Sequence, residues 1–249
     1  MRPSLSYTIW FSQRTGSTLL CRALASTGVA GHPGEHLYAE DLPALYARHG
    51  VDGPDELRTG LWQTASTPNG VLGLKHSMFE PWFGAVLGAL ADIEGHDGSR
   101  PGIWENAFPN GRHIFMTRRN KVRLAVSWWK AIQSQEWHRA YGAAASVADI
   151  ADRYSFDAID HLVAEATLRE AAIQEFFAEG RIIPLTLVYE DFVARYQETV
   201  RDLLRWLGIE PPCLTIAPPA YERLSDVVSE DWVQRFRRDK QAGWANRGW

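Results

Sequence analysis

The chain has 249 residues, of which 45% are hydrophobic, 12% aromatic and 22% charged. This composition is typical of a folded globular protein and excludes a disordered chain, a collagen and a disulfide scaffold. Its 26 basic and 30 acidic residues give a net charge of −4, which disfavours a nucleic-acid partner for the chain as a whole. We expect a single domain covering residues 1–249.

The chain has no feature of a membrane or secreted protein. Its apolar runs are all shorter than the ~20 residues of a membrane-spanning helix, and residues 1–14 lack the apolar core and cleavage site of a secretory signal. The two cysteines, Cys21 and Cys213, do not define a disulfide, and reduced thiols are the default inside cells. We expect a cytoplasmic protein without integral membrane association.

The N-terminal part predicts a strand, a loop and a helix in succession. Residues 6–11 (SYTIWF) are apolar and rich in β-formers, residues 12–17 are polar, and residues 18–25 place apolar side chains at helical spacing. The N–H groups and the positive end of the dipole of such a helix face the loop before it. Strand, loop and helix in this order open many nucleotide-binding α/β folds.

This loop has the residue types of an oxyanion site. Arg14 offers a fork of donors, Gly16 permits a close turn around a ligand, and Ser17 and Thr18 add hydroxyls. It is not a Walker A loop, GxxxxGK[ST], because the first Gly and the Lys are missing. We predict that it binds a phosphate or a similar oxyanion without a metal; the alternative is an ordinary turn with a Ser or Thr cap.

Residues 31–36 (GHPGEH) follow the first helix and can fold back over the anion loop. This segment is therefore the prime candidate to supply a general base. The same letters fit the zinc motif H-x-x-E-H, but that motif requires a helix, which Pro33 and Gly34 would break. We therefore expect no metal site here.

Further strands and helices alternate along the rest of the chain. Apolar runs predict three more strands, at residues 70–74, 113–116 and 182–188, although Pro184 weakens the last. Helical spacing is found at residues 120–135, 156–177, 199–207 and 231–238, and Pro- and Gly-rich loops are expected at residues 31–34, 92–109 and 210–219. This alternation predicts an α/β fold: a mostly parallel central sheet flanked by helices, in a P-loop-like three-layer architecture.

The predicted helix at residues 120–135 has a basic stripe. Arg119, Arg123, Ser127 and Lys130 recur every three or four residues and therefore share one face. Three cations and a hydroxyl can hold a second phosphate; the alternative is a solvated basic face.

An anion loop after the first strand, followed by Arg-x7-Ser after a later strand, resembles the PAPS-dependent sulfotransferases (PAPS is 3′-phosphoadenosine 5′-phosphosulfate). The sequence is most similar to the bacterial trehalose 2-sulfotransferase family. The phrases that match are SQRTGSTLLCRALASTGVAGHPGEHL, GLKHSMF, TRRNKVRLAVSWWKA, VYEDF and SEDWVQRFRRD. They extend from residue 12 to residue 239, which is most of the chain.

The resemblance implies a role for each matching residue. The 5′-phosphosulfate would be held by Arg14, Thr15, Gly16, Ser17 and Thr18. The 3′-phosphate would be held by Arg119 and Ser127, with Arg123 on the same stripe. Glu35 would be the general base; His76, at a strand end, is its rival, and Lys75 would neutralise the bridging oxygen.

The implied activity is transfer of a sulfuryl group from PAPS to a hydroxyl of a carbohydrate or glycolipid. PAPS and its product PAP would be the nucleotide partners, and a homodimer is expected from the family alone. We expect the acceptor pocket in loops such as residues 39–67. Two alternatives remain open: a kinase-like phosphoryl-transfer enzyme, and a non-catalytic protein that binds a nucleotide or anion.

Overall fold

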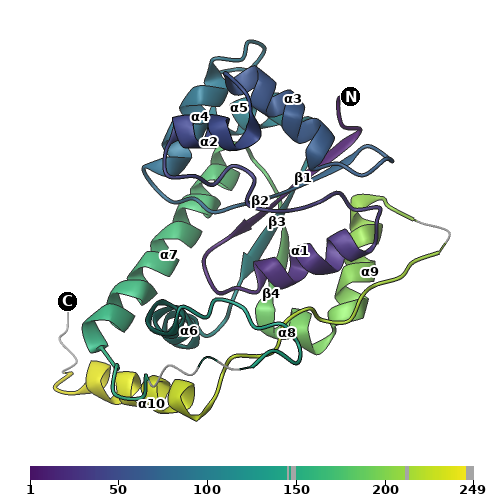
Figure 1. Cartoon of the computed structure of the whole chain (residues 1–249). Helices are drawn as coiled ribbons and strands as arrows, with labels where there is room; N and C mark the ends of the chain where they lie inside the picture. Colours follow the sequence, from purple (N-terminus) through teal and green to yellow (C-terminus); the bar gives the residue numbers. More distant parts are fainter. Residues whose placement is uncertain (145, 147–149, 211–212, 245–249) are drawn as a thin grey trace. The chain divides into compact units, whose positions relative to one another are not determined.

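The computed structural model describes residues 1–144, 146, 150–210 and 213–244. Within these residues the chain forms strands and helices in alternation (Figure 1). In chain order they are β1 (Leu5–Phe11), α1 (Ser17–Ser26), α2 (Leu42–His49), α3 (Pro54–Thr64), β2 (Val71–His76), α4 (Trp82–Ala91), α5 (Arg100–Ala107), β3 (Gly111–Thr117), α6 (Lys121–Ser134), α7 (Phe156–Glu179), β4 (Leu185–Val188), α8 (Tyr189–Ala194), α9 (Tyr196–Leu207) and α10 (Val227–Gln241).

The strands form one four-stranded sheet in the order β2-β1-β3-β4, and every neighbouring pair is parallel. The chain passes from β1 to β2 on one side and then returns to β3 on the other side of β1. The β1–β3 pair is therefore the point where the strand order reverses. In open α/β sheets ligands bind at the carboxyl ends of the strands beside such a point. The predicted α/β fold with a parallel central sheet is confirmed.

The described chain divides into two compact units, which are described separately. The sheet unit consists of Met1–Thr117 and Arg169–Ala220, and the helical unit of Arg118–Leu168 and Tyr221–Trp249. Helix α7 begins in the helical unit and ends in the sheet unit. The single domain that we expected from the sequence stays a prediction.

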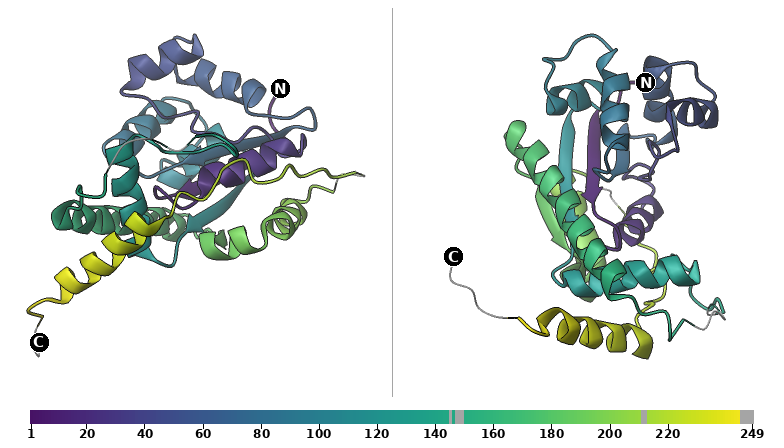
Figure 2. Two further views of the ribbon diagram at one scale, coloured as in Figure 1. Left: turned by 60° about the horizontal axis from the view of Figure 1, so that its bottom comes forward. Right: turned by 90° about the vertical axis from the view of Figure 1, so that its left-hand side faces the viewer.

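In the sheet unit, apolar clusters cover both faces of the sheet. Trp10, Leu74 and Phe115 pack on one face with helices α2 to α5 and with the end of α7. Ile9 and Met116 pack on the other face with α1 and α9. These three layers explain why the strands read as short, almost continuously apolar runs (Figure 1). Helices α8 and α9 follow β4 at the edge of the sheet (Figure 2).

In the helical unit, α6, the first half of α7 and α10 enclose a third apolar cluster, which includes Leu124, Ile159 and Trp232. Helix α10 begins with a capping box: the Asp226 carboxylate accepts from the Ser229 N–H, and the Ser229 hydroxyl oxygen accepts from the Asp226 N–H. Nowhere in the described residues is a helix both long enough and apolar enough to cross a membrane.

The predicted strands are present, but one predicted loop is wrong in part. Residues 92–109 contain α5, whose N-cap Ser99 accepts from the Gly102 N–H at 3.0 Å. Pro101 lies in the first turn of this helix, where a missing N–H costs nothing. The segment at residues 39–67, expected to form loops, contains α2 and α3. At the last strand, β4 starts directly after Pro184, so the proline breaks no hydrogen bond of the ladder.

Candidate active site

The carboxyl end of β1 leads into the predicted anion loop, here defined as residues 12–18. Two of its residues have left-handed backbone, with φ 63° at Arg14 and 81° at Gly16. Thr15 is fully buried, and its hydroxyl donates to the Ser12 carbonyl at 2.8 Å. Gly16 is the N-cap of α1 and has no side chain to cap it, so the N–H groups of the first turn face the loop. The loop has the backbone geometry that an oxyanion site needs.

Gly16 is restricted by a neighbour from the far end of the sheet as well as by its φ. A Cβ atom added there would lie 2.6 Å from Cδ2 of Tyr189, the first residue of α8. Only glycine fits between this ring and the loop. This contact could not be predicted from the sequence, because Tyr189 follows the edge strand β4, far along the chain.

Lys75 joins two of the predicted site residues. Its side chain is only 5% exposed, and its ammonium lies 2.5 Å from Oε1 of Glu35 and 2.9 Å from the hydroxyl of Thr18. The same ammonium lies 4.6 Å from the centre of the Phe11 ring. Glu35, Lys75 and Thr18 therefore come together at the start of α1, as the sequence predicts for a base beside an anion loop.

The backbone of the Glu35 segment is held against β2. The Lys75 N–H donates to the Gly34 carbonyl at 2.9 Å, and the His32 N–H donates to the Ala65 carbonyl at 2.9 Å. This segment is not helical, so His32 and His36 do not share a helix face as the zinc motif requires. In α1, burial raises the pKa of the Cys21 thiol to about 12. The thiol is therefore protonated and a poor nucleophile.

His76 lies on the other face of the sheet from Lys75, because successive residues of a strand alternate. It is 3% exposed and packs among Trp10, Phe83 and Trp104, with ring centres 5.4 to 6.1 Å away. Burial lowers the pKa of His76 to about 4. The structure thus brings Glu35 to the anion loop and places His76 in the aromatic core, which favours Glu35 over His76 as the base.

Sequence reasoning missed Glu170 of α7. It is 7% exposed and accepts hydrogen bonds from the hydroxyls of Ser12 and Thr117, each at 3.0 Å. A signal for it existed: Glu170 falls between Ala166 and Ile173 on the apolar face of the predicted helix. A carboxylate in an apolar stripe needs buried partners.

The residues expected to hold the 3′-phosphate belong to the helical unit. Arg119 is exposed, and Asn120 caps α6 by accepting from the Arg123 N–H at 3.0 Å. Arg123 is paired with Glu230 at 2.6 Å, and Ser127 is partly buried. Arg123 and Ser127 lie four residues apart in α6 and share a face, as predicted, whereas Arg119 precedes the N-cap of the helix. That they hold the 3′-phosphate stays a prediction.

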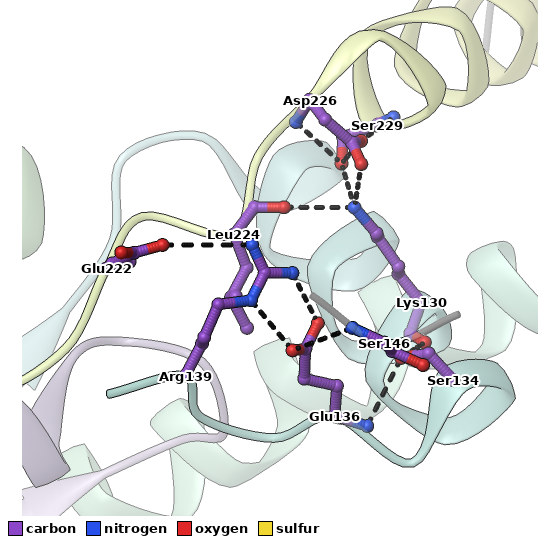
Figure 3. A network of polar contacts seen from close by, with 9 residues as sticks. All are labelled: Lys130, Ser134, Glu136, Arg139, Ser146, Glu222, Leu224, Asp226 and Ser229. Atoms are coloured by element: carbon purple, nitrogen blue, oxygen red, sulfur yellow. Dashed lines mark hydrogen bonds and ion pairs between the residues drawn. The ribbon is translucent and has the colours of Figure 1, made fainter. Parts of the chain in front are cut away.

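Lys130, the last member of the basic stripe, is held by α10. Its ammonium contacts Asp226 at 2.5 Å and the Leu224 carbonyl at 2.9 Å (Figure 3). Arg139 nearby makes a two-point contact with Glu136 at 2.7 and 2.8 Å. The Lys130 charge is therefore used within the helical unit to anchor the start of α10.

Comparison with known proteins defines the class. The fold resembles a crystal structure of a sulfotransferase from Alicyclobacillus acidocaldarius, with a TM-score of 0.53 and 13% identity over 96% of this chain and 93% of that chain. The model of the Stf0 sulphotransferase family matches residues 6–239. The chain belongs to the Stf0 sulphotransferase family, and it is a sulfotransferase.

Two curated relatives match over almost their whole length. Trehalose 2-sulfotransferase of Mycolicibacterium smegmatis is 29% identical, covering 95% of this chain and 96% of the relative. Trehalose 2-sulfotransferase of Mycobacterium tuberculosis is 28% identical, covering 94% of each chain. The resemblance stated from the sequence is confirmed.

Proposed function

We propose that this sulfotransferase moves the sulfuryl group of PAPS to a hydroxyl of a carbohydrate or glycolipid acceptor, with Glu35 as general base. The observation that carries the proposal is the shared contact of Lys75 with Glu35 and Thr18. It puts a carboxylate beside the loop whose N–H groups suit the 5′-phosphosulfate. Both curated relatives are named as trehalose sulfotransferases, which supports a sugar acceptor.

In the proposed reaction the acceptor oxygen attacks sulfur, the bond from sulfur to the bridging oxygen breaks, and PAP leaves. The acceptor proton passes to Glu35, which must lie within hydrogen-bond reach of that hydroxyl. Negative charge develops on the leaving oxygen, as in phosphoryl transfer. The first turn of α1, Arg14 and Lys75 stabilise that charge. The transferred group has one negative charge beyond the bridge, so the chemistry does not require a divalent metal.

The remaining site residues are assigned to the two ends of the nucleotide. Thr15, Gly16, Ser17 and Thr18 surround the 5′ end of the nucleotide, and Thr15 fixes the turn through its bond to Ser12. Arg119 and Ser127 hold the 3′-phosphate. Arg123 assists them only when the phosphate displaces Glu230, its ion-pair partner.

The function is tested by binding and transfer measurements on the whole chain. PAP at about 100 times its Kd should stabilise the protein by about 2.7 kcal/mol and raise Tm by about 8 °C, whereas ATP and NAD should not. Transfer of labelled sulfate from PAPS should occur to at least one member of a panel of trehalose, other disaccharides and glycolipids. A shift with ATP and magnesium but not with PAP would favour the kinase-like alternative. PAP binding without transfer would favour the non-catalytic one.

The base is tested by Glu35→Gln, with Glu94→Gln as the matched control, since Glu94 is an exposed glutamate of the sheet unit outside residues 31–67. Glu35→Gln should lower kcat about 10²- to 10⁴-fold and leave the PAP-induced shift in Tm unchanged. Glu94→Gln should behave like the wild type. If Glu35→Gln retains most of the rate while His76→Phe loses it, His76 is the base instead.

A further inference from the structure

Glu170 bridges the two strand ends that flank the anion loop. Its Oε1 accepts from Ser12, the residue after β1, and its Oε2 accepts from Thr117, the last residue of β3, each at 3.0 Å. All three residues belong to the sheet unit. They lie at the carboxyl ends of β1 and β3, where the strand order reverses and where ligands of open α/β sheets bind.

The bridge is connected to the loop through Ser12. The Ser12 side chain is fully buried and donates to Glu170, while its backbone carbonyl accepts from Thr15. The left-handed residues Arg14 and Gly16 flank Thr15. At a residue with a side chain, such as Arg14, this backbone persists only where surrounding contacts hold it, and Ser12, which contacts Glu170, lies at the base of the turn.

Burying the charged side chain of Glu170 costs free energy unless hydrogen bonds compensate for the lost water. A carboxylate behind an oxyanion site repels the ligand, and burying it requires hydrogen bonds. A carboxylate accepts from both hydroxyls at once, whereas a glutamine amide has one acceptor oxygen, so one hydroxyl would have to turn and accept from the amide N–H. Glutamine also lacks the negative charge that strengthens both hydrogen bonds.

We propose that Glu170 is a positioning residue, which holds the anion loop in its binding conformation through Ser12 and Thr117 and thereby sets the affinity for the 5′-phosphosulfate end of the nucleotide. The part of this inference that concerns the nucleotide rests on the proposed function. The part that concerns the loop does not.

The test compares Glu170→Gln with a core variant of α7 that loses a similar amount of stability. Ile173 is fully buried one turn further along the same helix, and either Ile173→Val or Ile173→Ala is chosen, whichever matches the Tm of Glu170→Gln. Glu170→Gln should raise the Kd for PAP about tenfold or more, and KM for PAPS should rise with it. The matched Ile173 variant should bind PAP within twofold of the wild type.

Two further variants separate the hydroxyl from the shape of its residue. Thr117→Val removes the hydroxyl and should weaken PAP binding, whereas Thr117→Ser keeps it and should restore most of the affinity. Ser12→Ala should weaken PAP binding, and adding Glu170→Gln to it should cost less than Glu170→Gln alone, because both changes break one bridge.

Amide hydrogen exchange of residues 12–18 provides a readout without nucleotide. Glu170→Gln should speed exchange in this loop, and the Ile173 variant should not. If the wild type binds PAP and Glu170→Gln binds it within twofold, the proposal is wrong. If the wild type binds no PAP, the proposed function fails, and exchange alone decides: faster exchange in Glu170→Gln supports the positioning role, and unchanged exchange refutes it.

Discussion

The substitution Gly16→Ala tests how closely Tyr189 packs against the anion loop, through the loss in free energy of unfolding. In Gly16→Ala the new Cβ would lie 2.6 Å from Cδ2 and 3.0 Å from Cε2 of Tyr189, and the residue would have to keep φ at 81°. The left-handed backbone costs about 1 kcal/mol for an L-residue, and overlap with a packed ring costs about 2 kcal/mol. The free energy of unfolding should therefore fall by about 3 kcal/mol, and Tm by about 9 °C for a chain of this size.

The two contributions separate in a double-mutant cycle with Tyr189→Ala. Without the ring only the backbone cost remains, so Gly16→Ala should cost about 1 kcal/mol in that background. Gly28→Ala is the matched control, because Gly28 has φ 69° but no atom within 4 Å of an added Cβ. It should also cost about 1 kcal/mol.

Urea unfolding followed by tryptophan fluorescence gives the free energies for all five proteins, which are the wild type, the three single variants and the double variant. A loss at Gly16 no larger than the loss at Gly28 would refute the packing of Tyr189 against the loop. An equal loss with and without the Tyr189 ring would refute it as well.

Two further predictions concern the core histidine and the 3′-phosphate. Because burial lowers the pKa of His76 to about 4, the unfolded chain binds more protons than the folded chain between pH 6.5 and pH 4, and stability falls as the pH falls. From pH 7 to pH 5 the contribution of His76 to this loss of stability is about 2 kcal/mol. Urea unfolding of His76→Phe should lack this contribution. Burial also lowers the pKa of His113 to about 4, but His113 is present in both proteins, so its contribution cancels in the comparison. An unchanged pH slope in His76→Phe would count against a buried neutral His76. Arg119→Ala should weaken PAP binding about tenfold or more while leaving binding of adenosine 5′-monophosphate unchanged, and calorimetry that finds equal losses for both nucleotides would contradict this assignment.

Much of the sheet could be predicted from the sequence because β1, β2 and the second half of β3 are buried on both faces. Runs such as residues 6–11 and 113–116 are largely apolar, and β1 and β3 include them. Helix α4 could not be predicted by periodicity, because Trp82–Ala91 (WFGAVLGALA) has no polar face. Helix α5 could not be predicted either, because Pro101 and Gly102 are typical of loops although they lie in the first turn of this helix.

At the candidate site, local order along the chain was informative and distant contacts were not. The anion loop could be predicted because strand, loop and helix are consecutive. The orientation of Lys75 and His76 was also accessible, since neighbouring residues of one strand face opposite sides of the sheet. The contact of Tyr189 with Gly16 depends on where β4 lies in the sheet, and no spacing within the sequence gives that position.

The net charge of −4 is compatible with an oxyanion site because the attraction is local. Lys75 is paired with Glu35, and Glu170 lies behind the loop, so the two carboxylates offset much of the positive charge near α1. The groups that we propose face the ligand are the first turn of α1, the Arg14 guanidinium and the Lys75 ammonium, which act over a few ångströms, well within the ~8 Å screening length of physiological salt. Donors held in place before the ligand arrives need no reorganisation when charge develops during transfer. In this proposal Glu170 fixes the geometry of the loop as a hydrogen-bond acceptor, and the affinity for an oxyanion depends on that geometry more than on the overall charge of the protein.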